Sequence, residues 1–166
     1  MLIQPGVLTS LLRLFKRKPT NNDGMRCLFV DGDMPLKPAL RMTEDLLKNY
    51  DKVFIYRISS EQSAPRSLVA FMKKYTNYDI SLFMIKHFAA GKETTDKYIM
   101  MSIQQCIDLY GARKIGVITG DMDFYDMSSA VQHFNPMHEI VYDIYMPKTI
   151  RANLKIRPPS TTINFV

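Results

Sequence analysis

Cysteine is scarce in this chain, and long apolar runs are absent. Cys27 and Cys106 are the only two cysteines among 166 residues, and both fall within apolar segments, which argues against a disulfide scaffold and against a Cys-rich zinc site. No apolar run approaches the roughly 18 to 20 residues that a membrane span needs. The apolar stretch 7–15 is followed rather than preceded by the basic run 16–18, which is the wrong order for a secretion signal. We therefore expect a cytoplasmic protein with no stable membrane insertion.

The basic residues are concentrated at the two ends of the chain. The sequence has 22 lysines and arginines against 16 acidic residues, a formal net charge of +6. Residues 1–25 carry +3 and residues 144–166 carry +4, which leaves 6 − 7 = −1 for residues 26–143. Two basic ends on a nearly neutral body suit a polyanion such as nucleic acid, and solvated tails that only aid solubility are an equal alternative.

Hydrophobic periodicity divides the chain into three parts. Turn-forming residues at 18–24 end a basic N-terminal segment and linker, residues 1–24, in which residues 8–18 form a predicted short amphipathic helix that we expect to dock on the body. Within the body, residues 25–146, apolar strands alternate with segments of helical spacing. The predicted strands are 25–30, 52–58, 80–85, 115–118 and 139–145, and the predicted helices are 36–50, 65–75, 95–110 and 124–134. The remaining residues, 147–166, form a basic C-terminal tail or an added edge element.

This alternation predicts the fold class. Strands and helices that follow one another with short connections form right-handed crossovers, and the result is a parallel sheet covered on both faces. We expect one α/β domain, a three-layer α/β/α sandwich around a mostly parallel five-stranded sheet of the Rossmann-like type.

Two of the predicted strands end in pairs of aspartates. Asp31 and Asp33 follow the first strand, and Asp121 and Asp123 follow the fourth. In open α/β sheets, ligands bind beyond the carboxyl ends of the strands where the strand order reverses, and these two strands are neighbours in the common doubly wound order. Four carboxylates gathered there repel one another unless protons or cations offset them. Mg²⁺ and Mn²⁺ prefer such oxygen ligands, which makes a phosphate ester the natural substrate, whereas each Asp-Gly pair taken alone is also a common turn.

Other polar residues carry weaker signals. Asp96 is a fifth candidate in the first turn of the third predicted helix, where the helix dipole alone also favours an acid. Lys92 lies in a segment similar to the end of a phosphate-binding loop, but Lys86 stands where such a loop needs glycine, which disfavours a nucleotide triphosphatase. Lys92 can still contact a phosphate. The three histidines lack metal-binding spacing, and no serine has a recognisable base partner, so the sequence gives no case for a histidine-metal site or a serine hydrolase.

With these motifs the chain resembles the NYN domains of the PIN-like ribonuclease superfamily, in particular their LabA-like bacterial branch. The resemblance covers residues 25–146 and depends on the segments 30–35, 92–96 and 119–124; the last, Thr-Gly-Asp-Met-Asp-Phe, is the most specific. It implies a Mg²⁺- or Mn²⁺-dependent ribonuclease that hydrolyses RNA with metal-activated water. The residues it implies are the catalytic and metal-binding acids Asp31, Asp96, Asp121 and Asp123, with Asp33 as a further candidate ligand, and the substrate-binding residues Lys92, Lys97 and Thr119.

One departure from the family pattern leaves alternatives open. Met34 stands where the family usually has an asparagine, and a thioether is a poor partner for a hard ion. Reduced activity, a ligand set that uses Asp33, and a non-catalytic nucleic-acid-binding or adaptor protein on the same fold are the alternatives. The RNA target, the cleavage mode and a homodimer are left open by the sequence.

A phosphatase of the haloacid dehalogenase type is the enzymatic rival. Asp31 and Asp33 fit its Asp-x-Asp spacing as nucleophile and acid/base, and Gly120-Asp121 with Asp126 could form its late motif. Met34 and Pro35 replace the residues usual after the second Asp, and that fold leaves Asp96 without a role, so this alternative ranks last.

Overall fold

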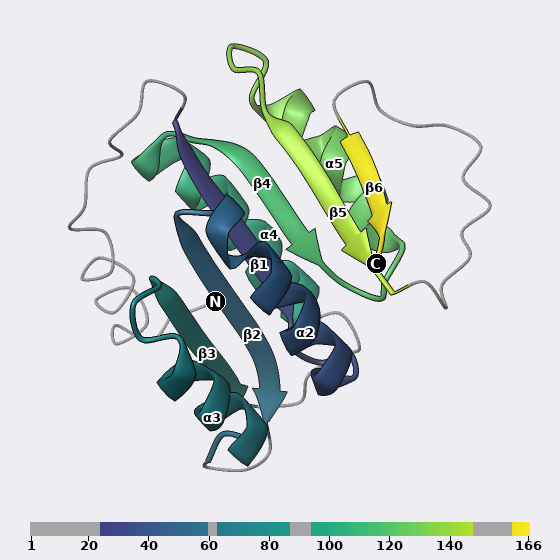
Figure 1. Cartoon of the computed structure of the whole chain (residues 1–166). Helices are drawn as coiled ribbons and strands as arrows, with labels where there is room; N and C mark the ends of the chain where they lie inside the picture. Colours follow the sequence, from purple (N-terminus) through teal and green to yellow (C-terminus); the bar gives the residue numbers. More distant parts are fainter. Residues whose placement is uncertain (1–23, 60–62, 87–93, 148–160) are drawn as a thin grey trace.

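The computed structural model describes residues 24–59, 63–86, 94–147 and 161–166 (Figure 1). The predicted helix at 8–18, Lys92, and most of both basic ends lie outside these residues. The strands are β1 (Met25–Asp31), β2 (Lys52–Ser59), β3 (Ile80–Lys86), β4 (Ala112–Ile118), β5 (Val141–Met146) and β6 (Thr161–Phe165). The helices are α2 (Leu36–Leu46), the short 3-10 helix η1 (Leu47–Asn49), α3 (Arg66–Lys74), α4 (Thr94–Tyr110) and α5 (Asp123–Phe134).

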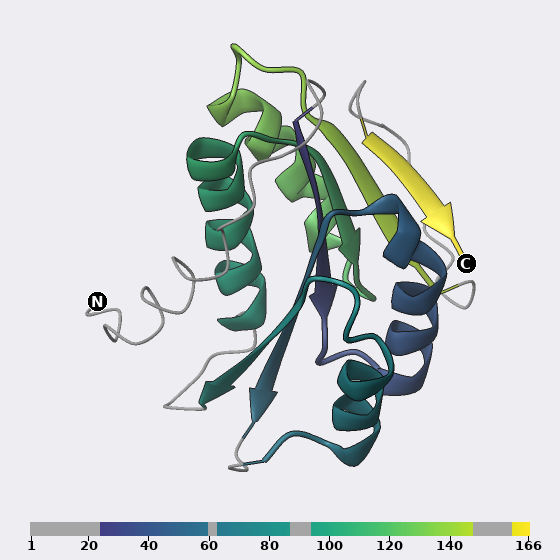
Figure 2. The ribbon, with the colours of Figure 1, turned by 60° about the vertical axis from the view of Figure 1, so that its left-hand side comes forward.

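All described strands belong to one parallel sheet, in the order β3-β2-β1-β4-β5-β6. Helices α2 and α3 cover one face, while α4 and α5 cover the other (Figures 1 and 2). The predicted α/β class and three-layer sandwich are therefore confirmed. The sheet has six strands rather than five, because residues 161–165 of the C-terminal part pair in parallel with β5 as the added edge element. The two prolines at 158–159 and the three polar residues that follow them hid this strand in the sequence.

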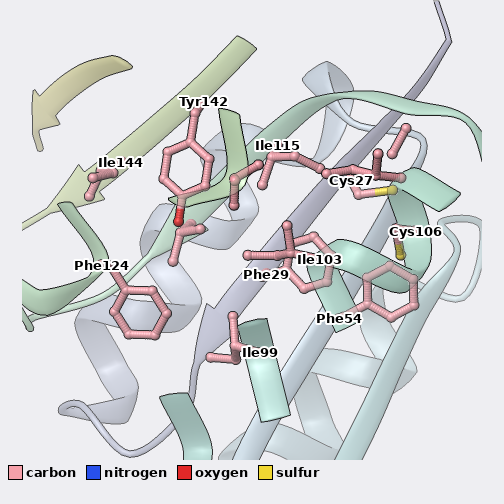
Figure 3. Close-up of a cluster of buried hydrophobic side chains, with 14 of the residues drawn as sticks. Cys27, Phe29, Phe54, Ile99, Ile103, Cys106, Ile115, Phe124, Tyr142 and Ile144 are labelled. Carbon is pink, nitrogen blue, oxygen red and sulfur yellow. The ribbon is translucent and has the colours of Figure 1, made fainter. Parts of the chain in front are cut away.

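The core lies on both faces of the sheet, and β1 is buried on each. Cys27 and Phe29 belong to the hydrophobic cluster under α4 and α5, whereas Leu28 and Val30 belong to the cluster under α2 and α3. Figure 3 shows the first cluster, in which Phe29 and other strand side chains meet apolar side chains of the helices. Burying one large apolar side chain contributes about 1.5–3 kcal/mol. This packing explains why β1 reads as a continuous apolar run rather than an alternating one.

The helix boundaries follow from proline and glycine. Pro35 and Pro65 stand directly before α2 and α3, where a fixed φ and a missing N–H cost nothing. Gly111 follows α4 with a φ of 65°, the left-handed conformation that commonly closes a helix. None of the described helices is long and apolar enough to cross a membrane.

The strand order fixes where a ligand would bind. The order reverses between β1 and β4, which are neighbours although β2 and β3 separate them in the chain. In open parallel sheets this switch point opens a crevice at the carboxyl ends of the two strands. We refer to this end of the sheet as the carboxyl edge and to the opposite end as the amino edge.

Candidate functional site

The centre of the candidate site is the point where β1 and β4 end side by side. Val30 pairs with Ile118 in the sheet register, so the next residues, Asp31 and Thr119, lie next to each other. The hydroxyl of Thr119 donates a hydrogen bond to Oδ2 of Asp31 at 3.2 Å. Thr119 is fully buried and Asp31 is 8% exposed. The switch point therefore holds a nearly buried carboxyl group that is oriented by a buried hydroxyl.

The same hydroxyl extends the hydrogen-bonded network into the turn after β4. Its oxygen accepts the backbone N–H of Asp121 at 3.0 Å, and Oδ1 of Asp121 accepts the backbone N–H of Asp123 at 2.9 Å. Asp123 is the first residue of α5. Asp31, Thr119, Asp121 and Asp123 are thus connected in sequence by three hydrogen bonds across two strands and a helix start. The ends of β1 and β4 thus meet, and the connection reaches Asp121 and Asp123 through their backbone N–H groups.

Both carboxylate oxygens of Asp33 accept hydrogen bonds from neighbouring elements at the carboxyl edge. Its Oδ1 accepts the backbone N–H of Ile58 from β2 at 2.9 Å, and its Oδ2 accepts the hydroxyl of Thr95 from α4. Its own N–H donates to Oδ1 of Asp31 at 3.0 Å. Asp33 therefore ties β2 and α4 to the turn after β1, and Thr95 brings the first turn of α4 to the site.

Arg57 and Thr95 are the contacts at this edge that sequence reasoning missed as site residues. Nη1 of Arg57 donates to the carbonyl oxygen of Gly32 at 2.5 Å, and the N–H of Gly32 donates to the carbonyl oxygen of Tyr56 at 2.7 Å. A Cβ at Gly32 would lie 2.6 Å from that same Tyr56 oxygen, so glycine is required by this close approach. A cation at the end of a central strand was the signal that could have pointed to Arg57.

The electrostatics of Asp31 reflect burial and crowding. Burial is the main cause that raises the pKa of the Asp31 carboxyl above its ordinary value, and the nearby charges of Asp33 and Asp121 raise it further. The hydrogen bonds from the N–H of Asp33 and the hydroxyl of Thr119 oppose the shift. A carboxylate held in this way is stabilised by a proton or by a cation.

The remaining predicted residues lie around this centre. Asp96 is in the first turn of α4, directly after Thr95, and is 9% exposed. Lys97 follows it and is exposed. Met34 is buried in the cluster under α2 and α3. Its thioether is thus a core group.

The donor chemistry at the carboxyl edge suits a hard divalent cation, because the candidate ligands are carboxylate oxygens. Asp121 and Asp123 are exposed, and the carboxylate of Asp123 makes no hydrogen bond or ion pair within the described part of the chain. Among the described residues, no three acidic, histidine or cysteine side chains are placed to hold one metal ion together. The structure therefore brings Asp31 into electrostatic contact with Asp33 and Asp121 without an assembled ligand set.

The comparisons with known proteins do not assign this site. No family model and no curated protein matches the chain. The likeness to NYN domains therefore stays a prediction from the motifs, and the fold is established by the architecture alone.

Proposed function

We propose that the protein is a Mg²⁺- or Mn²⁺-dependent ribonuclease whose reaction takes place at the carboxyl ends of β1 and β4. The observation that carries the proposal is the hydrogen-bonded connection of Asp31, Thr119 and Asp121 at the switch point. This is the position at which open α/β sheets bind ligands, and it gathers acids that need a counter-charge.

In this proposal Asp31, Asp96, Asp121 and Asp123 hold the cation. When bound, the cation supplies a polarised phosphoryl oxygen and an activated water. Thr119 orients Asp31 and favours its ionised form, because its hydrogen bond opposes the raised pKa of that carboxyl. Asp33 keeps β2 and α4 in place around the turn, and so acts as a positioning residue rather than a ligand.

RNA as the substrate follows from the resemblance and is supported by the charge of the chain. Lys97 is exposed one residue after Asp96 and would contact a phosphate, as would Lys92, which lies outside the described residues. A cytoplasmic location is part of the same proposal, with Cys27 and Cys106 present as buried free thiols.

An RNA-binding or adaptor protein on the same fold is the alternative. The observation that favours it is the lack of an assembled ligand set among the described residues. The haloacid dehalogenase reading is disfavoured further, because a general acid needs an oxygen that can approach the leaving group. Both oxygens of Asp33 already accept hydrogen bonds from Ile58 and Thr95.

The test is cleavage of a labelled single-stranded RNA in Mn²⁺ by the full chain. Asp121→Asn is the informative variant, because the amide oxygen can still accept the N–H of Asp123 and the fold is kept. Asp45→Asn is the matched control, since Asp45 is an exposed acid near the far end of α2. We expect cleavage that stops with EDTA and in Asp121→Asn and persists in Asp45→Asn. RNA binding without any cleavage would favour the adaptor, and cleavage retained by Asp121→Asn would contradict the proposal.

A further inference from the structure

Three cations belong to elements that begin or end at the carboxyl edge, around the acidic centre. Lys37 is in the first turn of α2, Arg57 is near the end of β2, and Arg66 is the first residue of α3. We call Lys37, Arg57 and Arg66 the basic edge. Since every strand is parallel and each helix starts where a strand has ended, all three belong to the same end of the sheet as Asp31.

The helix packing brings two members of the basic edge to the same level. Helices α2 and α3 lie side by side on one face of the sheet (Figures 1 and 2). Their last turns are joined by an ion pair between Lys74 and Glu44 at 3.0 Å. Counting back along both helices from this pair by the same two turns leads to Lys37 and to the first residues of α3. Arg57 joins them to the acidic centre through its bond to the carbonyl of Gly32, directly between Asp31 and Asp33.

These cations stand where the helices themselves disfavour them. A helix N-terminus carries partial positive charge, so acids in the first turn and bases in the last turn are the stabilising arrangement. Neither α2 nor α3 has an acid in its first turn, and Lys37 and Arg66 occupy those turns instead. The last turn of α3, in contrast, has the expected bases, Lys73 and Lys74. The basic edge is therefore not explained by helix stability.

The ion pairs that join described residues lie away from the basic edge. The ion pairs resolved between described side chains lie toward the amino edge: Arg26–Asp51, Lys52–Asp79, Lys74–Glu44 and Lys114–Asp143. The three basic-edge residues form no ion pair with any described residue. Lys37 and Arg66 are exposed, and Arg57 is half-buried. An anion from outside the chain can therefore approach all three without breaking an ion pair between described residues.

We infer that the basic edge binds successive phosphates of an RNA strand, so that the strand runs from the acidic centre at β1 and β4 across the end of β2 toward α3. The inference deepens the proposed ribonuclease function and depends on it for the choice of RNA. Arginine suits such a position because its planar fork can donate to a carbonyl and a phosphate together, and lysine supplies a mobile point charge. The aspartates would then face the reacting phosphate, and the cations would bind the phosphates next to it in the RNA strand.

The experiment measures binding of a short fluorescein-labelled single-stranded RNA by fluorescence anisotropy in EDTA, where no metal-dependent cleavage occurs. The variant Lys37→Glu/Arg66→Glu reverses two charges of the basic edge and leaves Arg57, which also supports the Gly32 turn, intact. The matched control, Lys48→Glu/Lys73→Glu, makes the same change in net charge at the opposite helix ends, where both residues are exposed.

We expect the basic-edge variant to bind at least about tenfold more weakly, and its dependence of log affinity on log salt to be shallower by about 1.4, as for two lost single-strand phosphate contacts. Its melting temperature should rise, because acids replace bases at helix N-termini, while that of the control should fall. Weaker binding with higher stability cannot come from misfolding. Equal weakening in both variants, or no weakening in the first, would overturn the inference. Because binding is read without catalysis, an RNA-binding chain that never cleaves would refute the proposed function and leave this result standing.

Discussion

Replacing Thr119 with valine removes the hydroxyl that joins Asp31 to the turn after β4, at almost constant volume. Two hydrogen bonds are lost: the donation to the Asp31 carboxylate and the acceptance of the Asp121 N–H. A bond to a charged group contributes about 1.5–3 kcal/mol and a neutral one about 0.5–1.5 kcal/mol. The lower half of the combined range applies because the first bond is long, so we expect the free energy of unfolding to fall by about 2–3 kcal/mol.

The loss should depend on pH with a defined sign. The hydroxyl of Thr119 lowers the pKa of Asp31, whose net shift is upward because of burial. Removing the hydroxyl raises the folded-state pKa further, so the folded state holds its proton more tightly. The destabilisation must then grow as pH rises through the titration of Asp31 and stay at its maximum above it. Below that range only neutral bonds are lost, and the effect should be smaller by about 1 kcal/mol.

Urea unfolding from pH 3.5 to pH 8 measures both quantities, and Thr43→Val is the matched control. Thr43 is equally buried, but its hydroxyl donates to the carbonyl of Ala39 within α2, at 2.7 Å, rather than to a carboxylate. We expect a loss of about 0.5–1.5 kcal/mol without pH dependence for that variant. If Thr119→Val shows the same small, pH-independent loss as Thr43→Val, the hydroxyl of Thr119 does not support the Asp31 carboxylate. That result would refute the site described above.

Three further predictions follow from single positions. Asp31→Asn should be more stable than the natural chain by an amount that grows with pH above the ordinary pKa of an aspartate, because the raised pKa of Asp31 means that its ionisation opposes folding; thermal melting at several pH values checks this, and a pH-independent difference would count against it. Gly32→Ala should lower the melting temperature and weaken any cleavage together, since its Cβ would lie 2.6 Å from the carbonyl oxygen of Tyr56; an alanine variant with natural stability would show that the turn is open. Ile103→Ala, in the buried cluster of Figure 3, should lower the free energy of unfolding in urea by about 2–5 kcal/mol without any pH dependence. A loss below about 1 kcal/mol would contradict the tight packing, because it would mean that the neighbouring side chains collapse into the space left by Ile103.

The parts of the fold that could be predicted are those set by local sequence. The apolar run from Met25 predicts a strand, and Pro65 followed by apolar residues at helical spacing predicts a helix. Both elements lie within a residue or two of the predicted bounds. Strand β6 is predicted only as one of two options, a tail or an added edge element, because the prolines and polar residues before it weaken the strand signal and its pairing with β5 is a tertiary feature. Edge strands depend on a neighbour that a single segment does not reveal.

The candidate site divides in the same way. Asp31 and Asp121 could be placed together because Asp31 directly follows one predicted strand, Asp121 lies three residues after the end of another, and the common strand order makes those strands neighbours. The bonds of Arg57 to Gly32 and of Thr95 to Asp33 depend on the register of β1 against β2 and on the position of α4, which are tertiary features. Met34 illustrates the limit of motif reasoning, because the structure uses it as a core side chain beneath α2.

Binding of Mn²⁺ measured by electron paramagnetic resonance titration tests the central claim most directly, because it reads the ion at the carboxyl edge without requiring a substrate. The natural chain and Asp45→Asn should bind the ion with equal affinity, and Asp121→Asn should bind it at least about tenfold more weakly, as expected when one carboxylate ligand of a hard cation becomes an amide. Equal affinity in all three proteins, or no binding to the natural chain, would contradict the assignment of Asp31, Asp96, Asp121 and Asp123 as a metal-dependent centre.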